Sequence, residues 1–185
     1  MLLNIHRGTN EIGGTCIELQ SGETRIILDL GLPLDSALNS ERNPINQRII
    51  EIANSSNGIL ISHSHLDHFG LIYSVSNEIP IWISKANHKI IDINRIFQNK
   101  NITISNPYYF KNEKPFGIGN FTVTPYLNDH SAFDSYSFLV EAEGKRLFYS
   151  GDFRNHGRKA SLFRKIISQP PKNIDYLLVE GTTIG

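Results

Sequence analysis

The sequence has almost no cysteine and no long apolar run. Its single cysteine, Cys16, excludes an internal disulfide and fits a reducing compartment, so we expect the protein in the cytoplasm. Cys16 lies in an apolar pattern, residues 15–19, and we interpret it as a small buried hydrophobic residue. No apolar stretch approaches the roughly 18 residues that span a membrane, and residues 1–7 turn polar too early for a secretory signal. We therefore expect no membrane partner.

An excess of charge is also missing. Lys and Arg number 18, and Asp and Glu also number 18, so the formal net charge at pH 7 is zero. This balance argues against a surface coated in basic charge for nonspecific nucleic-acid binding, but it leaves room for a local basic path. The length of 185 residues and the hydrophobic content of 39% are typical of one folded domain, or of a large part of one.

Apolar periodicity predicts two groups of strands with helices between and beyond them. Strands are expected at residues 2–6, 15–19, 25–29, 58–62 and 79–83, and then at 121–127, 136–142, 146–149 and 174–179, the last one buried. Helices are expected at residues 44–53, 69–75, 85–98 and 162–167, and a loop at 111–120. This order predicts α and β elements layered on mixed sheets.

Four metal-binding side chains occur within six residues, in the pattern H-x-H-x-D-H formed by His63, His65, Asp67 and His68. They lie on the loop that leaves the predicted strand at 58–62. Imidazole nitrogens and a carboxylate are the donors that borderline and hard divalent ions bind. The alternative, a polar loop with incidental histidines, does not account for this density of ligands at a strand end. The motif therefore predicts a metal site.

Other polar side chains also follow predicted strands. His130 comes after the strand at 121–127, and Asp152 follows the strand at 146–149, with Gly151 before it. A lone histidine of this kind would be a satisfied or exposed side chain, and a lone aspartate a turn residue. Strand ends can assemble a site from distant parts of a chain, so beside the histidine cluster each is predicted to be a ligand.

These motifs resemble the metallo-β-lactamase superfamily of metal-dependent hydrolases. The resemblance implies an α/β (α+β) fold, the metallo-β-lactamase-like αββα sandwich. Residues 7–16, 130–135, 149–154 and 178–183 further resemble the β-CASP nucleases, which include ribonuclease J and the endonuclease of the cleavage and polyadenylation machinery. The resemblance covers essentially the whole chain.

The same resemblance implies two metal ions that share one carboxylate. The first ion is assigned to His63, His65, His130 and Asp152, and the second to Asp67, His68 and Asp152. By the same resemblance Asp29 braces the metal loop. Two divalent ions about 4 Å apart lower the pKa of a shared water and so supply a hydroxide nucleophile. We expect zinc on ligand type, with manganese as the alternative.

The expected catalytic residues are therefore Asp67, His68 and Asp152. Cations that follow them, Arg154, His156 and Arg158, are expected to bind a phosphate backbone, and a solvated helix face is the alternative. We expect a phosphodiesterase that acts on RNA, with DNA as the less favoured substrate. Two other functions stay open: a small-molecule thioester or lactone hydrolase, and a non-catalytic metal-stabilised interaction module.

One departure from the family pattern concerns the second metal. No histidine follows His156, so the final histidine ligand of the family has no counterpart in residues 1–185. We interpret the chain as the N-terminal portion of a longer nuclease, without the β-CASP insertion and the C-terminal remainder of the fold. A natural short protein with a reduced site is the alternative. We expect a weak second metal site, low nuclease activity, and an exposed sheet edge that favours a homo-oligomer.

Overall fold

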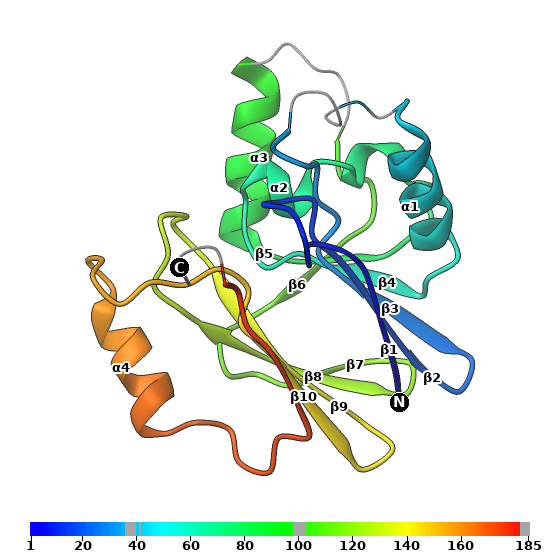
Figure 1. The fold of residues 1–185 in the computed structure, drawn as a ribbon. Coiled ribbons are helices and arrows are strands. Elements are labelled where there is room, and N and C mark those ends of the chain that lie inside the picture. Colours follow the sequence, from blue (N-terminus) through cyan, green and yellow to red (C-terminus); the bar gives the residue numbers. More distant parts are fainter. Residues whose placement is uncertain (36–39, 41, 98–102, 182–185) are drawn as a thin grey trace.

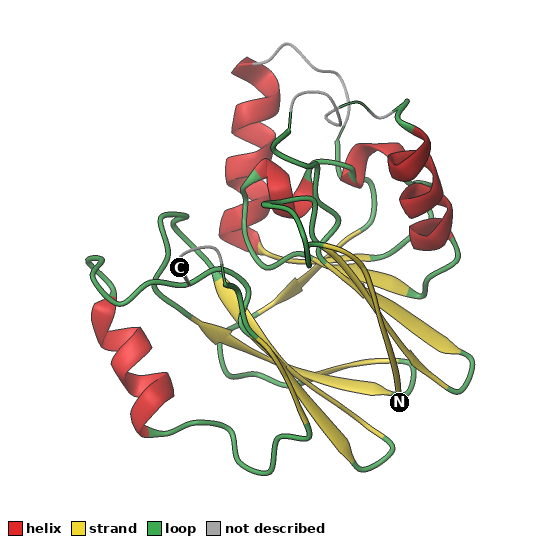
Figure 2. Ribbon diagram, in the orientation of Figure 1, coloured by secondary structure: helices red, strands yellow, loops and turns green. Residues whose placement is uncertain are grey.

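The computed structural model describes residues 1–35, 40, 42–97 and 103–181. Its helices and strands form two sheets that lie face to face, with helices on their outer sides (Figures 1 and 2). Two expectations fall in part outside the described residues: the end of the helix at Gln98, and Thr182 and Thr183 of the last resemblance segment.

The first sheet has six strands in the order of the sequence. They are β1 (Leu2–Arg7), β2 (Cys16–Ser21), β3 (Thr24–Leu28), β4 (Gly58–Leu60), β5 (Ile81–Ser84) and β6 (Pro107–Phe110). The first three strands are antiparallel, and the next three run parallel to β3 because helical connections return the chain to the same edge. The carboxyl ends of β3, β4 and β5 therefore meet at one edge of the sheet.

The second sheet has five strands, in the order β11-β10-β9-β8-β7. They are β7 (Phe116–Ile118), β8 (Phe121–Leu127), β9 (Tyr136–Ala142), β10 (Lys145–Tyr149) and β11 (Tyr176–Leu178). In the antiparallel β8–β10 meander a loop at 128–135 joins β8 to β9 and a tight turn at 143–144 joins β9 to β10, and β11 pairs in parallel with β10 as an edge strand.

Alternating side chains of the strands separate two apolar cores. Ile26 and Leu28 point between the sheets, where they join a cluster that includes Phe121 and Phe138. Ile27, between them in sequence, belongs instead to the core under the helices. The period of two along a strand thus gives each face of the first sheet its own layer to pack against.

Helices cover the outer faces of both sheets. They are α1 (Pro44–Asn54), α2 (Leu66–Phe69) and α3 (Lys85–Phe97) over the first sheet, and α4 (Ala160–Ser168) beside the second (Figure 1). This arrangement is the expected αββα sandwich. Within the described residues, no helix is both long enough and apolar enough to cross a membrane.

Three local expectations were wrong. The loop expected at 111–120 contains β7, because Phe116 stacks on Trp82 with ring centroids 4.5 Å apart and the strand pairs with β8. The helix expected at 69–75 is two pieces, α2 and a 3-10 turn at Ile72–Ser74. The strand expected to be buried at 174–179 is the exposed edge strand β11, with Leu177 63% exposed.

One strand and one helix face were not anticipated. The aromatic segment Pro107–Phe110 forms the edge strand β6. In α3 the buried positions are Asn87 and Ile91, whereas Phe97 is 85% exposed. Edge strands and partly solvated helices give weak periodic signals, because only a few of their side chains face a core.

Candidate metal centre

The predicted ligands come together where the strands of both sheets end. The segment that carries His63 to His68 follows β4, His130 follows β8, and Asp152 follows β10. His65 occupies the position before α2, so that short helix begins inside the ligand motif. Residues far apart in the chain therefore share one edge of the sandwich.

Three imidazoles and one carboxylate form the first donor cluster. The Nδ1 atom of His65 lies 3.1 Å from Nε2 of His63 and 3.2 Å from Nε2 of His130. The three donor atoms fall within 4.8 Å of one another. Oδ2 of Asp152 completes the group, at 3.6 Å from Nε2 of His130 and 4.0 Å from Nε2 of His63.

A second donor cluster begins at the other oxygen of Asp152. Its Oδ1 lies 3.2 Å from Nε2 of His68, and His63 joins the two in a group within 4.8 Å. Oδ2 of Asp67 lies 3.8 Å from Nε2 of the same histidine. The two oxygens of one carboxylate thus face two neighbouring clusters.

Asp29 is buried beside this centre and holds several of its parts. Its carboxylate accepts hydrogen bonds from the backbone N–H and the hydroxyl of Ser62, both at 2.7 Å. The Tyr149 hydroxyl donates to it at 2.6 Å, and Nδ1 of His68 lies 2.8 Å from it. The aspartate adopts a left-handed backbone, φ 57°, which aspartate tolerates better than most residues.

Ser62 and Tyr149 are not among the residues that the sequence predicts for the site. The sequence signal for them is weak, since each is a single hydroxyl that follows a short apolar run. Their contacts with Asp29 depend on the packing of the two sheets, because Asp29 and Ser62 follow β3 and β4 in the first sheet and Tyr149 ends β10 in the second.

Contacts on the far side of two rings orient their donor nitrogens. Nδ1 of His63 lies 3.0 Å from the Ser62 hydroxyl, and Nδ1 of His68 contacts Asp29. Each ring therefore turns its Nε2 towards the centre. Metal-binding histidines are commonly held in this way by an oxygen on the other ring nitrogen.

Burial keeps the three imidazoles of the first cluster neutral. It lowers the pKa of His63 well below its ordinary value, and the neighbouring imidazoles lower it further. It also lowers the pKa of His65, and that of His130 to about 4 against the opposing charge of Asp152. Neutral imidazole is the form that binds a metal ion, so these rings are ready to bind one near pH 7.

The second cluster has a more negative electrostatic environment, because two carboxylates face His68. Burial opposes protonation of His68, but the carboxylates of Asp29 and Asp152 prevail and raise its pKa to about 10. Burial raises the pKa of Asp152, yet its contacts with His68 and the other imidazoles lower it overall. The surroundings thus favour a positive charge between the two carboxylates, a place that suits a divalent cation.

Backbone contacts fix the loop that carries Asp67 and His68. The N–H of Thr15 donates to the carbonyl of Asp67 at 3.2 Å, and that of Leu30 donates to the carbonyl of His68 at 2.8 Å. Gly31 packs so closely that a Cβ atom there would lie 1.7 Å from the Asp67 carbonyl oxygen. The glycine is needed for this approach, because any side chain would displace the ligand loop.

The predicted substrate-binding residues lie between Asp152 and α4. Arg154 is partly buried and donates its backbone N–H to the carbonyl of Asp129 at 2.7 Å. Its Nε lies 3.4 Å from the buried carboxylate of Asp129, which precedes the predicted ligand His130. His156 and Arg158 are exposed on the same loop. Arg154 is therefore fixed against the metal centre, and the other two are less constrained.

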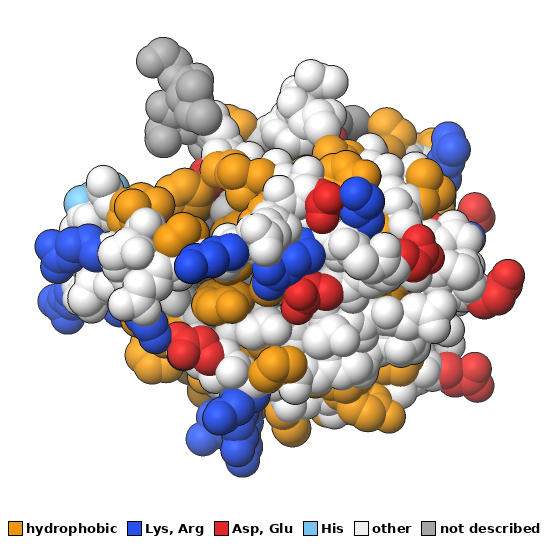
Figure 3. Space-filling model, turned by 90° about the horizontal axis from the view of Figure 1, so that it is seen from below, with side chains coloured by type: hydrophobic (Ala, Val, Ile, Leu, Met, Phe, Trp, Pro, Cys, Tyr) orange, Lys and Arg blue, Asp and Glu red, His pale blue; other side chains and the backbone are white. Residues whose placement is uncertain are grey.

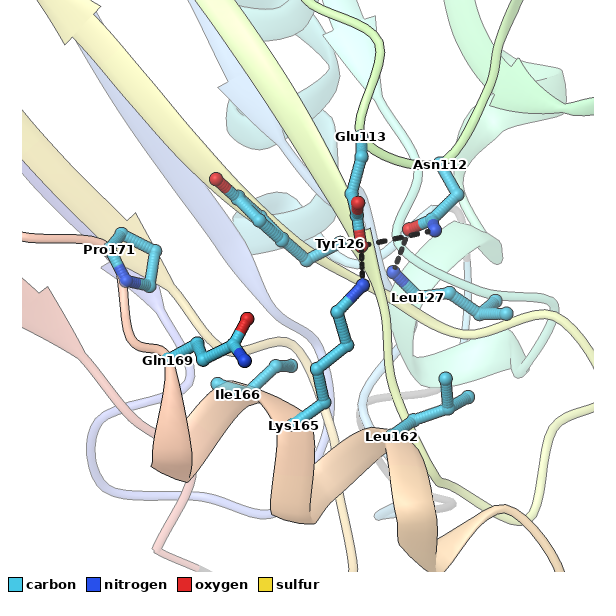
Figure 4. Close-up of a pocket in the computed structure, with 9 residues that line it drawn as sticks. All are labelled: Asn112, Glu113, Tyr126, Leu127, Leu162, Lys165, Ile166, Gln169 and Pro171. Carbon is cyan, nitrogen blue, oxygen red and sulfur yellow. Dashed lines mark hydrogen bonds and ion pairs between the residues drawn. The ribbon is translucent and has the colours of Figure 1, made fainter.

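A separate surface hollow of about 140 Å³ lies between α4 and the second sheet (Figure 4). Lys165 and Glu113 form an ion pair across it. None of its lining residues is one of the six predicted ligands. The cation of Lys165 is neutralised there, so this part of α4 is less suited to bind phosphate than the loop before it.

Residues 24–184 match the family described as the beta-lactamase superfamily domain. The chain is 23% identical over 199 residues to the RNase J-like protein of Methanocaldococcus jannaschii, covering 98% of this chain and 42% of that protein. It is 23% identical over 152 residues to Ribonuclease J of Helicobacter pylori, covering 80% of this chain and 22% of that protein. The chain thus spans less than half the length of these relatives.

Solved structures share the fold. A protein of unknown function from Enterococcus faecalis V583 superposes with a TM-score of 0.81 at 21% identity, covering 98% of this chain and 50% of that one. Zn(2+)-bound PqqB from Methylobacterium extorquens superposes with a TM-score of 0.61 at 14% identity, covering 91% and 60%. At these identities the likeness concerns the fold alone.

Proposed function

Since this chain belongs to the beta-lactamase superfamily, we propose that it is a metal-dependent phosphodiesterase module whose substrate is RNA. The observation that carries the proposal is the division of the Asp152 carboxylate between two donor clusters, with Oδ2 towards His130 and Oδ1 towards His68. A bridging carboxylate of this kind suits a pair of divalent ions. Paired ions favour hydrolysis of a phosphodiester, where negative charge must be neutralised on the group attacked.

The donor atoms fit zinc best, and manganese is the second candidate. His63, His65, His130 and Asp152 would hold the first ion, and Asp67, His68 and Asp152 the second. When bound, the ions would supply Lewis-acid activation of water and neutralisation of phosphate charge. Because fewer residues of this chain reach the second cluster, we expect that site to be the weaker one.

The residues of the chain have distinct tasks in this proposal. Asp29 contacts the ring of His68 and the backbone of Ser62, so it orients both ends of the segment that carries the predicted ligands His63 to His68. Arg154, fixed on Asp129 beside the centre, would bind a phosphate oxygen of the substrate. His156 and Arg158 would extend this basic path outward from the same loop.

The choice of RNA rests on the relatives and on charge. The relatives named RNase J-like protein and Ribonuclease J support a ribonuclease of the β-CASP branch. Although the net charge is zero, charge is unevenly distributed: on the face in Figure 3, which is viewed from below and turned away from the strand ends that carry the centre, Lys and Arg are more frequent on the α4 side and Asp and Glu on the opposite side. An uneven distribution of charge lets a neutral protein attract a polyanion locally.

The proposal is tested with three substrates, each with zinc or manganese added: labelled single-stranded RNA, a phosphodiester dye and a thioester. Single-stranded DNA of the same sequence measures the preference for RNA. We expect slow RNA cleavage, because the second metal site is expected to be weak, and we expect His65→Ala and Asp152→Ala to abolish it. His88→Ala is the matched control, because His88 lies on α3 and pairs with Tyr109 and Asp92 instead.

Other outcomes would contradict the proposal. Thioester turnover without nucleic-acid cleavage would indicate a small-molecule hydrolase with the same ligands. Stoichiometric metal binding without turnover of any substrate would indicate a metal-stabilised interaction module.

A further inference from the structure

An exposed aromatic side chain lies in the loop that carries the candidate ligand His130. Phe133 is 72% exposed, although it lies only three residues after the ligand His130 in the loop between β8 and β9. The preceding residue, Ala132, is 6% exposed, so the loop is anchored while the ring is left in solvent. Single exposed apolar side chains are common on protein surfaces, so the inference depends on the support of this loop and on its short distance in sequence from His130.

The backbone of this loop is held from two sides. The ammonium group of Lys159, next to the start of α4, donates to the carbonyls of Ala132 at 3.1 Å and of Phe133 at 2.6 Å. On the other side, the Asn87 amide donates to the carbonyl of Asp134 at 2.6 Å.

The carboxylate of Asp134 adds further contacts. It accepts hydrogen bonds from the hydroxyls of Ser84 and, at 3.4 Å, of Tyr136. These contacts come from the ends of β5 and β9, so the loop is tied to both sheets. The ring of Phe133 is therefore displayed by a rigid support. A rigid aromatic loses little conformational entropy when a ligand packs on it.

Resting on the function proposed above, we propose that Phe133 is a base-stacking residue that binds an unpaired nucleobase of the RNA strand at the metal centre. An aromatic ring offers a flat apolar face to any base, and the contact requires a base that is free of its own stack. The cations of Arg154 and Arg158 on the neighbouring loop suit the phosphates on either side of that base. The substrate class is thus single-stranded RNA, with one base seated close to the hydrolysed bond.

The position of the ring predicts where along the RNA the contact falls. Because Phe133 shares its loop with His130, the stacked base belongs to a nucleotide near the phosphate that the centre binds. A remote base would need a different aromatic. Phe97 provides the comparison, since it is 85% exposed but lies at the end of α3.

The test measures RNA binding by fluorescence anisotropy, with the zinc-loaded chain and a labelled single-stranded oligonucleotide. We expect Phe133→Ala to weaken binding by about 5-fold to 150-fold, the range that loss of one base stack gives. Phe133→Trp should restore binding, and Phe97→Ala should leave it unchanged. Thermal unfolding of each variant checks that the exposed substitutions leave the fold intact.

A set of oligonucleotides with one abasic position, moved step by step along the strand, identifies the base. At one position the abasic probe should bind wild type weakly, and Phe133→Ala should cause no further loss. An equal effect of Phe133→Ala on every probe would overturn the inference, because it would indicate a general change in the loop. RNA binding that Phe133→Ala does not weaken would also overturn it while leaving the proposed function standing. Wild type that neither binds nor cleaves RNA would overturn both.

Discussion

Oδ2 of Asp29 lies 2.8 Å from Nδ1 of His68, although 39 residues separate them in the chain. The same oxygen accepts the hydroxyl hydrogen bonds of Ser62 and Tyr149. One buried carboxylate thus joins the ends of β3, β4 and β10 and orients a predicted metal ligand. Among the residues outside the predicted ligands, we expect substitution of Asp29 to have the largest effect on metal binding.

Replacement of this carboxylate by an amide should weaken metal binding. Asp29→Asn keeps the side-chain size and the tolerance for a left-handed backbone, but it removes the charge that faces His68. We expect zinc affinity to fall by about 10-fold to 100-fold and the free energy of unfolding by about 1–3 kcal/mol. Calorimetric zinc titration and urea unfolding measure the two effects. Glu23→Gln, at an exposed turn, is the control, and an equal loss there would contradict the interpretation.

A methyl group at Gly31 should displace the ligand loop. Its Cβ would lie 1.7 Å from the carbonyl oxygen of Asp67, so Gly31→Ala cannot be accommodated without movement of that backbone. We expect a loss of about 1–3 kcal/mol in the free energy of unfolding together with reduced metal binding. Gly117→Ala is the matched control, because the nearest atom to a Cβ there is 3.9 Å away. A Gly31→Ala protein with unchanged zinc stoichiometry and stability would disprove the close approach.

The buried thiol should make the protein less stable in alkali. Burial, followed by the charges of Glu18 and Asp29, raises the pKa of Cys16 from 9.0 to about 12. Between these values the unfolded chain loses the thiol proton and the folded chain keeps it. The contribution of this group is therefore fully present below pH 9 and is lost as the pH rises towards 12, by up to about 1.4 kcal/mol per pH unit.

Urea unfolding of wild type and Cys16→Ala at several pH values between 8 and 10.5 isolates this contribution. Wild type should lose stability faster than the variant across that range. The native thiol should also resist a thiol reagent at pH 8 and react after denaturation, because it is fully buried. Identical pH slopes for the two proteins would show that the thiol does not titrate in this way.

Metal removal should lower the unfolding temperature. An ion that binds only the folded state, present at 100 times its Kd, raises the free energy of unfolding by about 2.7 kcal/mol. For a chain of this size that raises the unfolding temperature by about 5–10 °C. A chelator should remove this increment and zinc should restore it. His65→Ala should unfold at the same temperature with or without zinc, whereas His88→Ala should respond like wild type. If zinc still raised the unfolding temperature of His65→Ala, the ion would bind outside the first cluster.

Removal of the positive charge of Arg154 should weaken the binding of RNA of any base sequence. Because it is expected to contact phosphate and not a base, Arg154→Ala should reduce the slope of log affinity against log salt by about one. Arg48→Ala removes the same charge from α1 and should change the slope less. Anisotropy titrations between about 50 and 200 mM salt provide the measurement. A sequence-dependent loss with an unchanged slope would contradict phosphate binding.

Much of the fold follows from local pattern. The strands at β2, β3, β8 and β9 have strict alternation or continuous apolar runs, and each lies within two residues of its expected position. The strands that pattern failed to predict, β6 and β7, lie at the edges of the sheets, and so does β11, which was predicted as a strand but wrongly as a buried one. Such strands are defined by the partner they pair with, which local sequence does not contain.

The sequence by itself predicted the candidate donor residues. The spacing of His63, His65, Asp67 and His68 requires only that they follow one strand, and that requirement is local. Tertiary structure decided the rest: that the two oxygens of Asp152 face different clusters, and that Asp29 and Tyr149 brace the loop from other strands. These contacts arise from the register of two packed sheets, so their directions depend on long-range packing that residue order alone does not specify.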